Sequence, residues 1–258
     1  MGISTVNRAP AKPSTQQVAD APRSSFVRTA LAVAADLDRT QFQRLSALTA
    51  ERRFVARGSA LFRCGERLVA LYEVHAGIFK SCLVDQSGRS QVTGFQMSGD
   101  LLGLDGIGTE RHCVDVVALE DALVCVVPFA ELNELLQDSS ALQRQFHKAM
   151  SREIVRDQAM MLTLGTMPAE GRIAAFVLDL SQRLFERGFS PSALVLRMTR
   201  EEIGSFLGLQ IETVSRGFSK LHLDGVLEIC NRNVTVLDPV ALRCIAQGGV
   251  RNASMSSL

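Results

Sequence analysis

The stretch TREEIGSFLGLQIETVSRGFSKL, residues 199–221, predicts two short helices on either side of a tight turn at residues 207–209. Thr199 is a suitable N-cap for the first helix, and Glu202 three residues later completes a capping box. The second helix combines an apolar face with a separate polar face near its start. The apolar face consists of Val214, Phe218 and Leu221, and the polar face consists of Glu212, Ser215 and Arg216. A DNA-reading helix-turn-helix needs this layout, although an ordinary helical hairpin with a solvated outer face has the same spacing.

The segment after these helices favours DNA reading. Residues 226–229 and 234–237 are β-rich runs joined by the turn-like Asn231-Arg232-Asn233. A hairpin that directly follows a recognition helix forms a wing. We therefore expect a winged helix-turn-helix over residues 197–237.

These residues resemble the CRP/FNR family of bacterial transcription regulators, whose helix-turn-helix has the form T-R-x-x-I-x-x-x-L-G-L-x-x-E-T-V-S-R. The positions that fit are Thr199, Arg200, Ile203, Leu207, Gly208, Leu209, Glu212, Thr213, Val214, Ser215 and Arg216. Residues 153–154, 157–158, 174–176 and 187–191 look like the FNR branch, and the resemblance spans roughly residues 37–245. It implies a sequence-specific regulator that binds double-stranded DNA as a homodimer and contacts RNA polymerase. The expected DNA contacts are Thr199, Arg200, Gln210, Glu212, Thr213, Ser215, Arg216 and Lys220.

The resemblance also implies a DNA site. The pattern E-x-x-S-R accompanies half-sites related to TTGAT in the FNR branch, which suggests control of oxygen-, redox- or nitrogen-oxide-responsive genes. Arg216 can donate a bidentate pair to guanine, and Glu212 can accept from a cytosine amino group. A dimer would read two half-sites about one helical turn apart. The alternative is an interaction module that responds to a small ligand or haem without FNR-type DNA specificity, and the joint presence of Glu212, Ser215 and Arg216 argues against it.

The bulk properties add limits. No apolar run approaches the roughly 20 residues of a transmembrane helix, and the N-terminus lacks the apolar centre of a secretory signal. We therefore expect a cytoplasmic protein without a membrane partner. The net charge is only +1, so DNA affinity has to come from positioned residues rather than from an overall basic field. The sequence has no nucleophile elbow, phosphate loop or His-Glu-x-x-His motif, which argues against an enzyme.

The chain divides into an all-β part and an α-rich part, which predicts an α+β fold. We expect a short amphipathic helix over residues 37–54, and then many short strands with glycine-rich turns up to residue 128, which suggest a small barrel or roll. The resemblance makes this a cyclic-nucleotide-binding-like jelly roll. The expected divisions are a disordered tail (1–25), a β-roll sensor (26–138), a dimerisation helix (139–166), the winged helix-turn-helix domain (167–248) and a flexible tail (249–258).

A coiled-coil seam runs along the expected dimerisation helix at positions 143, 147, 150, 154, 157, 161 and 164, where the spacing alternates between four and three. The expected dimer contacts are His147, Met150, Ile154, Asp157 and Met161. Asp157 stands where an apolar residue is expected, and two facing aspartates in a parallel pair would repel each other. Either Asp157 lies just off the interface and is solvated, or it weakens the dimer deliberately, as the matching aspartate in the FNR branch is understood to do.

The signal is less well defined than the DNA site. Cyclic AMP relatives hold the ligand with Gly-Glu and Arg-Ser pairs, whereas this chain has Gly103-Leu104-Asp105 and His112-Cys113, which argues against cyclic AMP. On a strand, Arg111 would point to the opposite face from the one required. Cys125 matches one FNR cluster ligand, but residues 1–63 contain no cysteine, which argues against the standard 4Fe-4S cluster.

The cysteines leave several possibilities open. Isolated cysteines in strands most often behave as small buried hydrophobic residues. A thiol redox switch or an unconventional metal site made from Cys64, Cys82, Cys113 and Cys125 is the alternative, and His75 and His112 are candidate haem or metal ligands.

Overall fold

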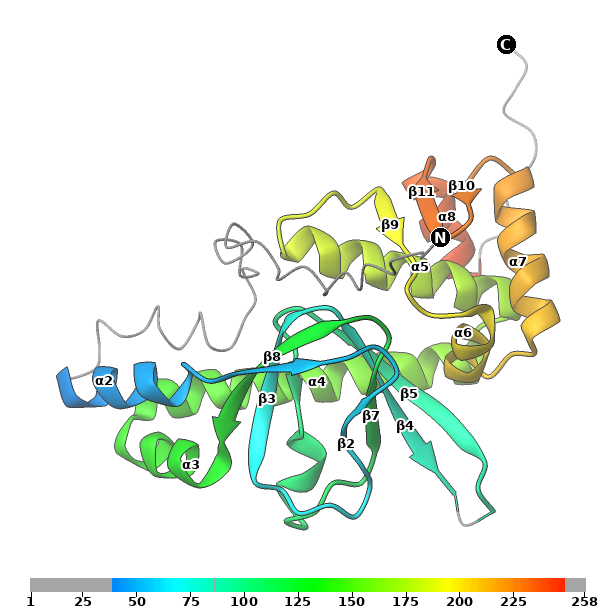
Figure 1. Ribbon diagram of the computed structural model, residues 1–258. Helices are drawn as coiled ribbons and strands as arrows, with labels where there is room; N and C mark the ends of the chain where they lie inside the picture. The colour runs from blue at the N-terminus through cyan, green and yellow to red at the C-terminus, as the bar shows by residue number, and fades with distance from the viewer. Residues whose placement is uncertain (1–38, 86, 249–258) are drawn as a thin grey trace, which may run out of the picture.

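The computed structural model describes residues 39–85 and 87–248. The tails expected at residues 1–25 and 249–258 lie outside the described residues. Within them the fold is α+β, with an antiparallel β-roll followed by a long helix and a C-terminal helix-turn-helix domain (Figure 1).

Two four-stranded antiparallel sheets form the β-roll. The first has the order β1-β8-β3-β6, with bounds Arg52–Val55, Ala122–Pro128, Ala70–Ala76 and Leu101–Leu102. The second has the order β2-β7-β4-β5, with bounds Ala60–Phe62, Asp115–Ala118, Ile78–Val84 and Ser90–Met97. Apolar side chains from both sheets pack between them, among them Phe62, Val74, Phe79, Val116 and Val124. A tight turn joins β4 to β5, and there the Asp85 carboxylate accepts hydrogen bonds from the Ser87 and Arg89 amides at 2.8 and 2.9 Å.

The helix expected over residues 37–54 is shorter than predicted. Helix α2, Arg39–Leu48, stops before β1 begins at Arg52. The prediction of helix to residue 54 is wrong because Arg52–Val55 pairs in antiparallel register with β8, from Arg52 opposite Cys125 to Val55 opposite Ala122. This long-range pairing overrides the local pattern.

Three helices cover the outer side of the first sheet. They are α2, α3 (Phe129–Asp138) and the first turns of α4 (Ser140–Thr166). Leu45, Leu132, Leu135, Leu142 and Phe146 pack with Leu71, Cys125 and Val127 of the sheet in one buried cluster. Ser139 caps α4 by accepting a hydrogen bond from the Leu142 amide at 3.4 Å. The long helix is thus anchored to the β-roll at its N-terminal end.

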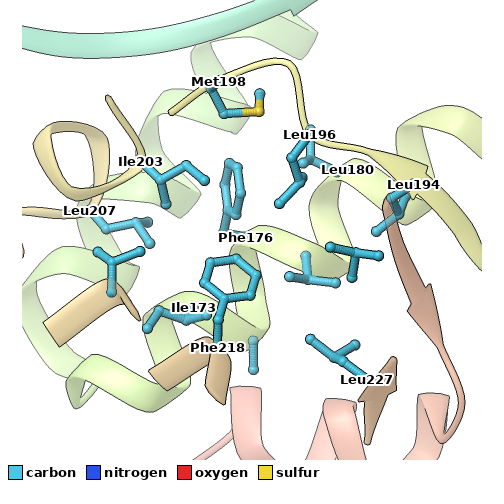
Figure 2. Close-up of a cluster of buried hydrophobic side chains, with 14 of the residues drawn as sticks. Ile173, Phe176, Leu180, Leu194, Leu196, Met198, Ile203, Leu207, Phe218 and Leu227 are labelled. Atoms are coloured by element: carbon cyan, nitrogen blue, oxygen red, sulfur yellow. The ribbon is translucent and has the colours of Figure 1, made fainter. Parts of the chain in front are cut away.

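The C-terminal domain is built around α5, Ala169–Glu186. The other elements are β9 (Ala193–Val195), α6 (Arg200–Leu207), α7 (Ile211–Leu223), β10 (Leu227–Cys230), β11 (Asn233–Val236) and α8 (Pro239–Ala246). The wing is a three-stranded sheet of order β10-β11-β9, because β9 adds to the expected hairpin. Figure 2 shows how Ile173 and Phe176 of α5 meet Ile203 and Leu207 of α6 and Phe218 of α7.

None of the helices in the described part of the chain is both long and apolar enough to cross a bilayer.

Candidate nucleic-acid interface

The helix-turn-helix is held by its predicted cap and by a tight turn. The Thr199 hydroxyl accepts from the Glu202 amide at 3.1 Å, and the Glu202 carboxylate accepts from the Thr199 amide at 2.7 Å. Gly208 ends α6 in the left-handed region at φ 63°, which glycine adopts without steric cost. Gly204 allows the turn to fold back, because a Cβ there would lie 2.6 Å from the Leu209 carbonyl oxygen. These contacts set the angle between α6 and α7.

The two faces of α7 separate as predicted. Val214, Phe218 and Leu221 are buried at 0–2% exposure. Glu212, Ser215 and Arg216 are exposed and, with Ile211, line an open hollow at the start of the helix. Arg216 donates from Nε to the Glu212 backbone oxygen at 3.3 Å, and no ion pair joins the two side chains among the described residues. Both charged groups therefore stay available to a ligand on this surface.

Most of the other residues predicted to contact DNA are partly buried or bonded within the protein. Gln210 is exposed at the N-cap of α7 and Thr213 is half-buried. The Thr199 hydroxyl is engaged in the cap of α6. Lys220 Nζ lies 2.5 Å from Glu170 Oε2 of α5, and this hydrogen bond raises the pKa of Lys220. A phosphate contact by Lys220 would have to replace that pair.

Arg200 is turned toward the protein. Its guanidinium carbon lies 3.6 Å from the centre of the Phe218 ring, a cation–π contact between α6 and α7. Its Nη1 is buried without a hydrogen-bond partner, and burial lowers the pKa of the group. The structure thus places Arg200 as a contact between the two helices and not beside Glu212 and Arg216. The expectation of a DNA contact there is not supported by this placement.

The long helix α4 exposes an apolar face on its second half. Of the predicted dimer contacts, Ile154 and Met161 are 56% and 66% exposed, His147 is exposed, and Met150 is half-buried. Asp157 is exposed between them, and partial burial raises the pKa of its carboxyl. The sequence interpretation missed Val155 and Leu162, which are 59% and 62% exposed and widen this face. Their spacing of seven residues, one position after Ile154 and Met161, was the available signal.

Comparison with known proteins agrees with this architecture. Residues 171–245 match the model of the Crp-like helix-turn-helix domain, and residues 52–139 match that of the cyclic nucleotide-binding domain. The chain is 43% identical over 203 residues to the transcriptional regulatory protein btr of Bordetella pertussis, covering 79% of this chain and 84% of that protein. It is 37% identical over 218 residues to the fumarate and nitrate reduction regulatory protein of Escherichia coli, covering 84% and 87%.

The chain belongs to the CRP/FNR family of transcription regulators.

A solved structure agrees with the fold of this regulator. FixK2 from Bradyrhizobium japonicum superposes with a TM-score of 0.70 at 26% identity, covering 76% of this chain and 96% of that one. Like its FNR-type relatives, which are transcription regulators, the chain is a DNA-binding protein and not an enzyme.

The four β-roll cysteines of the regulator differ in burial. Cys64 and Cys113 are exposed, whereas Cys82 and Cys125 are buried. The Cys125 thiol donates to the Thr49 carbonyl oxygen at 3.0 Å, and burial raises the pKa of both Cys82 and Cys125. No group of three or more His, Cys, Asp or Glu side chains in residues 39–85 and 87–248 is arranged to hold a metal. Among the described residues, the alternative of a metal site made from Cys64, Cys82, Cys113 and Cys125 therefore finds no support, since two of the thiols are exposed and two are buried.

The same donor set does not fit the FNR-type cluster. Such a cluster needs four thiolates, and Cys125 is engaged with Thr49 inside the β-roll. Residues 1–63 of this chain contain no cysteine to complete the set.

A buried histidine, His112, lies beside Gly103 in the stretch that the resemblance aligns with the ligand-holding residues of the cyclic AMP relatives. Gly103 precedes a short 3₁₀ turn, Leu104–Gly106, and a Cβ on Gly103 would lie 3.3 Å from the His112 ring. His112 is 3% exposed and stacks on Phe62 with ring centres 3.7 Å apart. Arg111 points outward and donates to the Gly65 carbonyl oxygen at 2.7 Å. The buried polar side chain at this segment is thus an imidazole, and the Arg111 guanidinium is bonded to the backbone at the surface.

Proposed function

We propose that this regulator binds, as a homodimer, to palindromes with TTGAT half-sites and controls oxygen-, redox- or nitrogen-oxide-responsive genes together with RNA polymerase. One observation carries the proposal. Glu212, Ser215 and Arg216, the residues of the FNR-type reading pattern, are exposed together around one hollow on the first turns of α7. A recognition helix reads bases with side chains in this position.

The chemistry of these three side chains suits the proposed half-site. The Arg216 guanidinium presents a planar fork that matches guanine O6 and N7, and the Glu212 carboxylate accepts from a cytosine amino group. Ser215 is short enough to let the helix approach the bases closely. Because the chain has a net charge of only +1, specificity rests more on these contacts than on overall attraction.

The exposed face of α4 supports the homodimer. Ile154, Val155, Met161 and Leu162 are all more than half exposed on one side of the helix. A second copy of the same helix covers such a stripe in a two-fold pair, and a two-fold pair matches a palindrome.

The proposal is tested by titrating the full chain against a palindrome of two TTGAT half-sites and against the same duplex with scrambled half-sites. Arg216→Ala should weaken binding to the palindrome by about 1–3 kcal/mol and relax the preference at one guanine. The matched control is Arg243→Ala, which removes the same charge from an exposed position on α8.

The wild-type chain should prefer the palindrome, and Arg243→Ala should keep that preference. An equal loss for both variants, or an unchanged base preference of Arg216→Ala in a selection from randomised sites, would contradict the assignment.

A further inference from the structure

A single buried carboxylate joins the β-roll, the long helix and the DNA-binding domain. Asp100 lies in the turn between β5 and β6 and is 7% exposed. Its Oδ2 accepts from Arg183 Nη2 at 2.6 Å, and its Oδ1 accepts from Arg187 Nη2 at 2.6 Å. Arg156 Nη1 lies 3.9 Å from Oδ1. Arg183 comes from α5, Arg187 is the residue that caps the C-terminal end of α5, and Arg156 comes from α4, so this carboxylate interacts with all three parts of the chain.

The arginines also bind the backbone of the β-roll. Arg183 Nη2 donates to the Phe95 carbonyl oxygen at 2.8 Å, and Arg187 Nε donates to the Ser98 carbonyl oxygen. The Met97 amide donates to Asp100 Oδ2 at 2.9 Å, which fixes the carboxylate in its own turn. Burial alone would raise the pKa of Asp100, but Arg183, Arg187 and Arg156 together hold it below its usual range. The carboxylate is thus ionised and fully engaged.

A buried ion cluster of this kind fixes geometry. Removing these charges from water is costly, and they regain that free energy only while the carboxylate and the guanidinium groups keep their mutual positions. Directional hydrogen bonds from two arginines one helical turn apart leave α5 little freedom to rotate against the β-roll. The cluster therefore favours one discrete orientation rather than a range.

The contacts beside the cluster transmit this orientation to the helix-turn-helix. Phe95 of β5 packs against Phe176 of α5 and Phe206 of α6, with ring centres 6.1 and 5.1 Å apart. The Val92 amide donates to Ser205 Oγ at 2.9 Å, and Lys80 Nζ lies 2.7 Å from Glu202 Oε1. Since α6 carries α7, the position of the recognition helix relative to α4 depends on this interface (Figure 1).

We propose that Asp100 is a positioning residue for DNA reading, which sets the half-site spacing that the dimer accepts by fixing the DNA-binding domain against the long helix. The inference rests on the proposed function, in which α4 carries the dimer axis and each α7 reads one half-site. In a two-fold pair, a rotation of each DNA-binding domain changes the separation of the two recognition helices. The separation that suits one turn of DNA is about 34–36 Å, so a change of one base pair is already unfavourable.

The test uses the full chain and a series of palindromes whose central spacer is changed by zero, one or two base pairs in each direction. Wild type should bind one spacer much more tightly than the others. Asp100→Asn should reduce the ratio between the best and the worst spacer by at least tenfold. The matched control is Asp179→Asn, since Asp179 pairs with the same Arg183 at 3.4 Å but does so from within α5, with its side chain 44% exposed.

A purely structural role for Asp100 predicts a different result. It would weaken binding to every spacer by the same factor and leave the ratio unchanged, and that outcome overturns the proposal. Should Asp100→Asn not fold, Arg187→Lys keeps the charge and loses the planar fork. It should also reduce the ratio, and an unchanged ratio again overturns the proposal.

Hydrogen exchange without DNA separates this proposal from the proposed function. The Val92 amide, which donates across the interface, should exchange faster in Asp100→Asn than in wild type, whereas amides of β8 should not change. Equal exchange at Val92 would overturn the positioning role. If the wild-type chain binds no palindrome while the Val92 amide still exchanges faster in Asp100→Asn than in wild type, the result contradicts the proposed function. The fixed domain orientation is supported in that case.

Discussion

Helices α4 and α5 are neighbours in the chain, and both carry apolar side chains at helical spacing, but α5 buries them within the chain whereas the second half of α4 leaves them exposed. Ile173, Phe176 and Val177 of α5 are at most 2% exposed. Ile154 and Met161 of α4 are 56% and 66% exposed. The stripe of α5 is covered by α6, α7 and the β5 strand of the β-roll. Figure 2 shows Ile173 and Phe176 of this stripe beside Ile203 and Leu207 of α6 and Phe218 of α7.

Apolar side chains at helical spacing predict that one face of a helix is covered. The spacing does not say whether the same chain or another molecule covers that face. For α5 the covering elements follow in the same chain. For α4 the face points away from the described residues of the same chain, and a second copy supplies the cover in the proposed homodimer. Stability should therefore depend on α5, and association should depend on α4.

The largest effect is expected from Phe176→Ala in α5. The ring is 2% exposed and contacts both Phe95 and Phe206, so the substitution leaves a cavity between the two domains. The free energy of unfolding should fall by about 3–5 kcal/mol. Denaturant unfolding followed by circular dichroism measures this change, and a loss below about 1 kcal/mol would contradict the view that α5 anchors the fold.

A smaller effect, confined to association, is expected from Ile154→Ala in α4. The side chain is more than half exposed in the single chain, so the monomer should lose little stability. In a two-fold dimer the loss occurs twice, and burial of an isoleucine contributes about 1.5–3 kcal/mol, which makes the dimer weaker by roughly 100-fold or more. Sedimentation equilibrium measures the dimer constant. Leu223→Ala, at a position 83% exposed on α7, is the control and should leave the constant unchanged.

The smallest effect, of opposite sign, is expected from Asp157→Ala. Two facing carboxylates repel each other, so removing both should strengthen the dimer by about 1–2 kcal/mol, or roughly 5- to 30-fold, and raise DNA occupancy without a signal. Asp157→Asn keeps the size and removes the charge, and it should reproduce most of the gain. Equal dimer constants for both variants and the wild type would place Asp157 outside the interface.

The pH dependence of association gives a second measurement on Asp157. Partial burial already raises the pKa of its carboxyl in the single chain, and a facing aspartate would raise it further. The dimer then binds the proton more tightly than the monomer does. Wild-type association should therefore strengthen as the pH falls through the range in which the carboxyl takes up a proton, and this dependence should vanish in Asp157→Ala.

Local features of the fold were predictable from the sequence. The cap at Thr199, the turn at Gly208 and the two faces of α7 depend on residues a few positions apart, and all are confirmed. The hairpin of β4 and β5 depends on local residues in the same way, since the Asp85 carboxylate accepts hydrogen bonds from the Ser87 and Arg89 amides of its own turn. Strand β1 was taken for helix because its partner β8 lies some 70 residues further along the chain.

Features made by distant residues were not predictable. Arg200 fits the family pattern for DNA contact, but its guanidinium packs over the ring of Phe218 on the next helix. Asp100 is separated from Arg183 and Arg187 by more than 80 residues, and no motif links them. A shared site of the four β-roll cysteines was one of the alternatives, but the tertiary structure leaves Cys64 and Cys113 exposed and buries Cys82 and Cys125, with no three-ligand group among the described residues.

The sequence by itself determined the reading surface, because helix capping, turn geometry and side-chain periodicity act over a few residues and leave Glu212, Ser215 and Arg216 on the outer face of α7. Only the tertiary structure decided how that surface is held. The buried contact of Asp100 with Arg183 and Arg187 forms where three separate parts of the chain meet. Charges that pack together out of water stabilise one arrangement of those parts, and that arrangement exists only once the whole chain has folded.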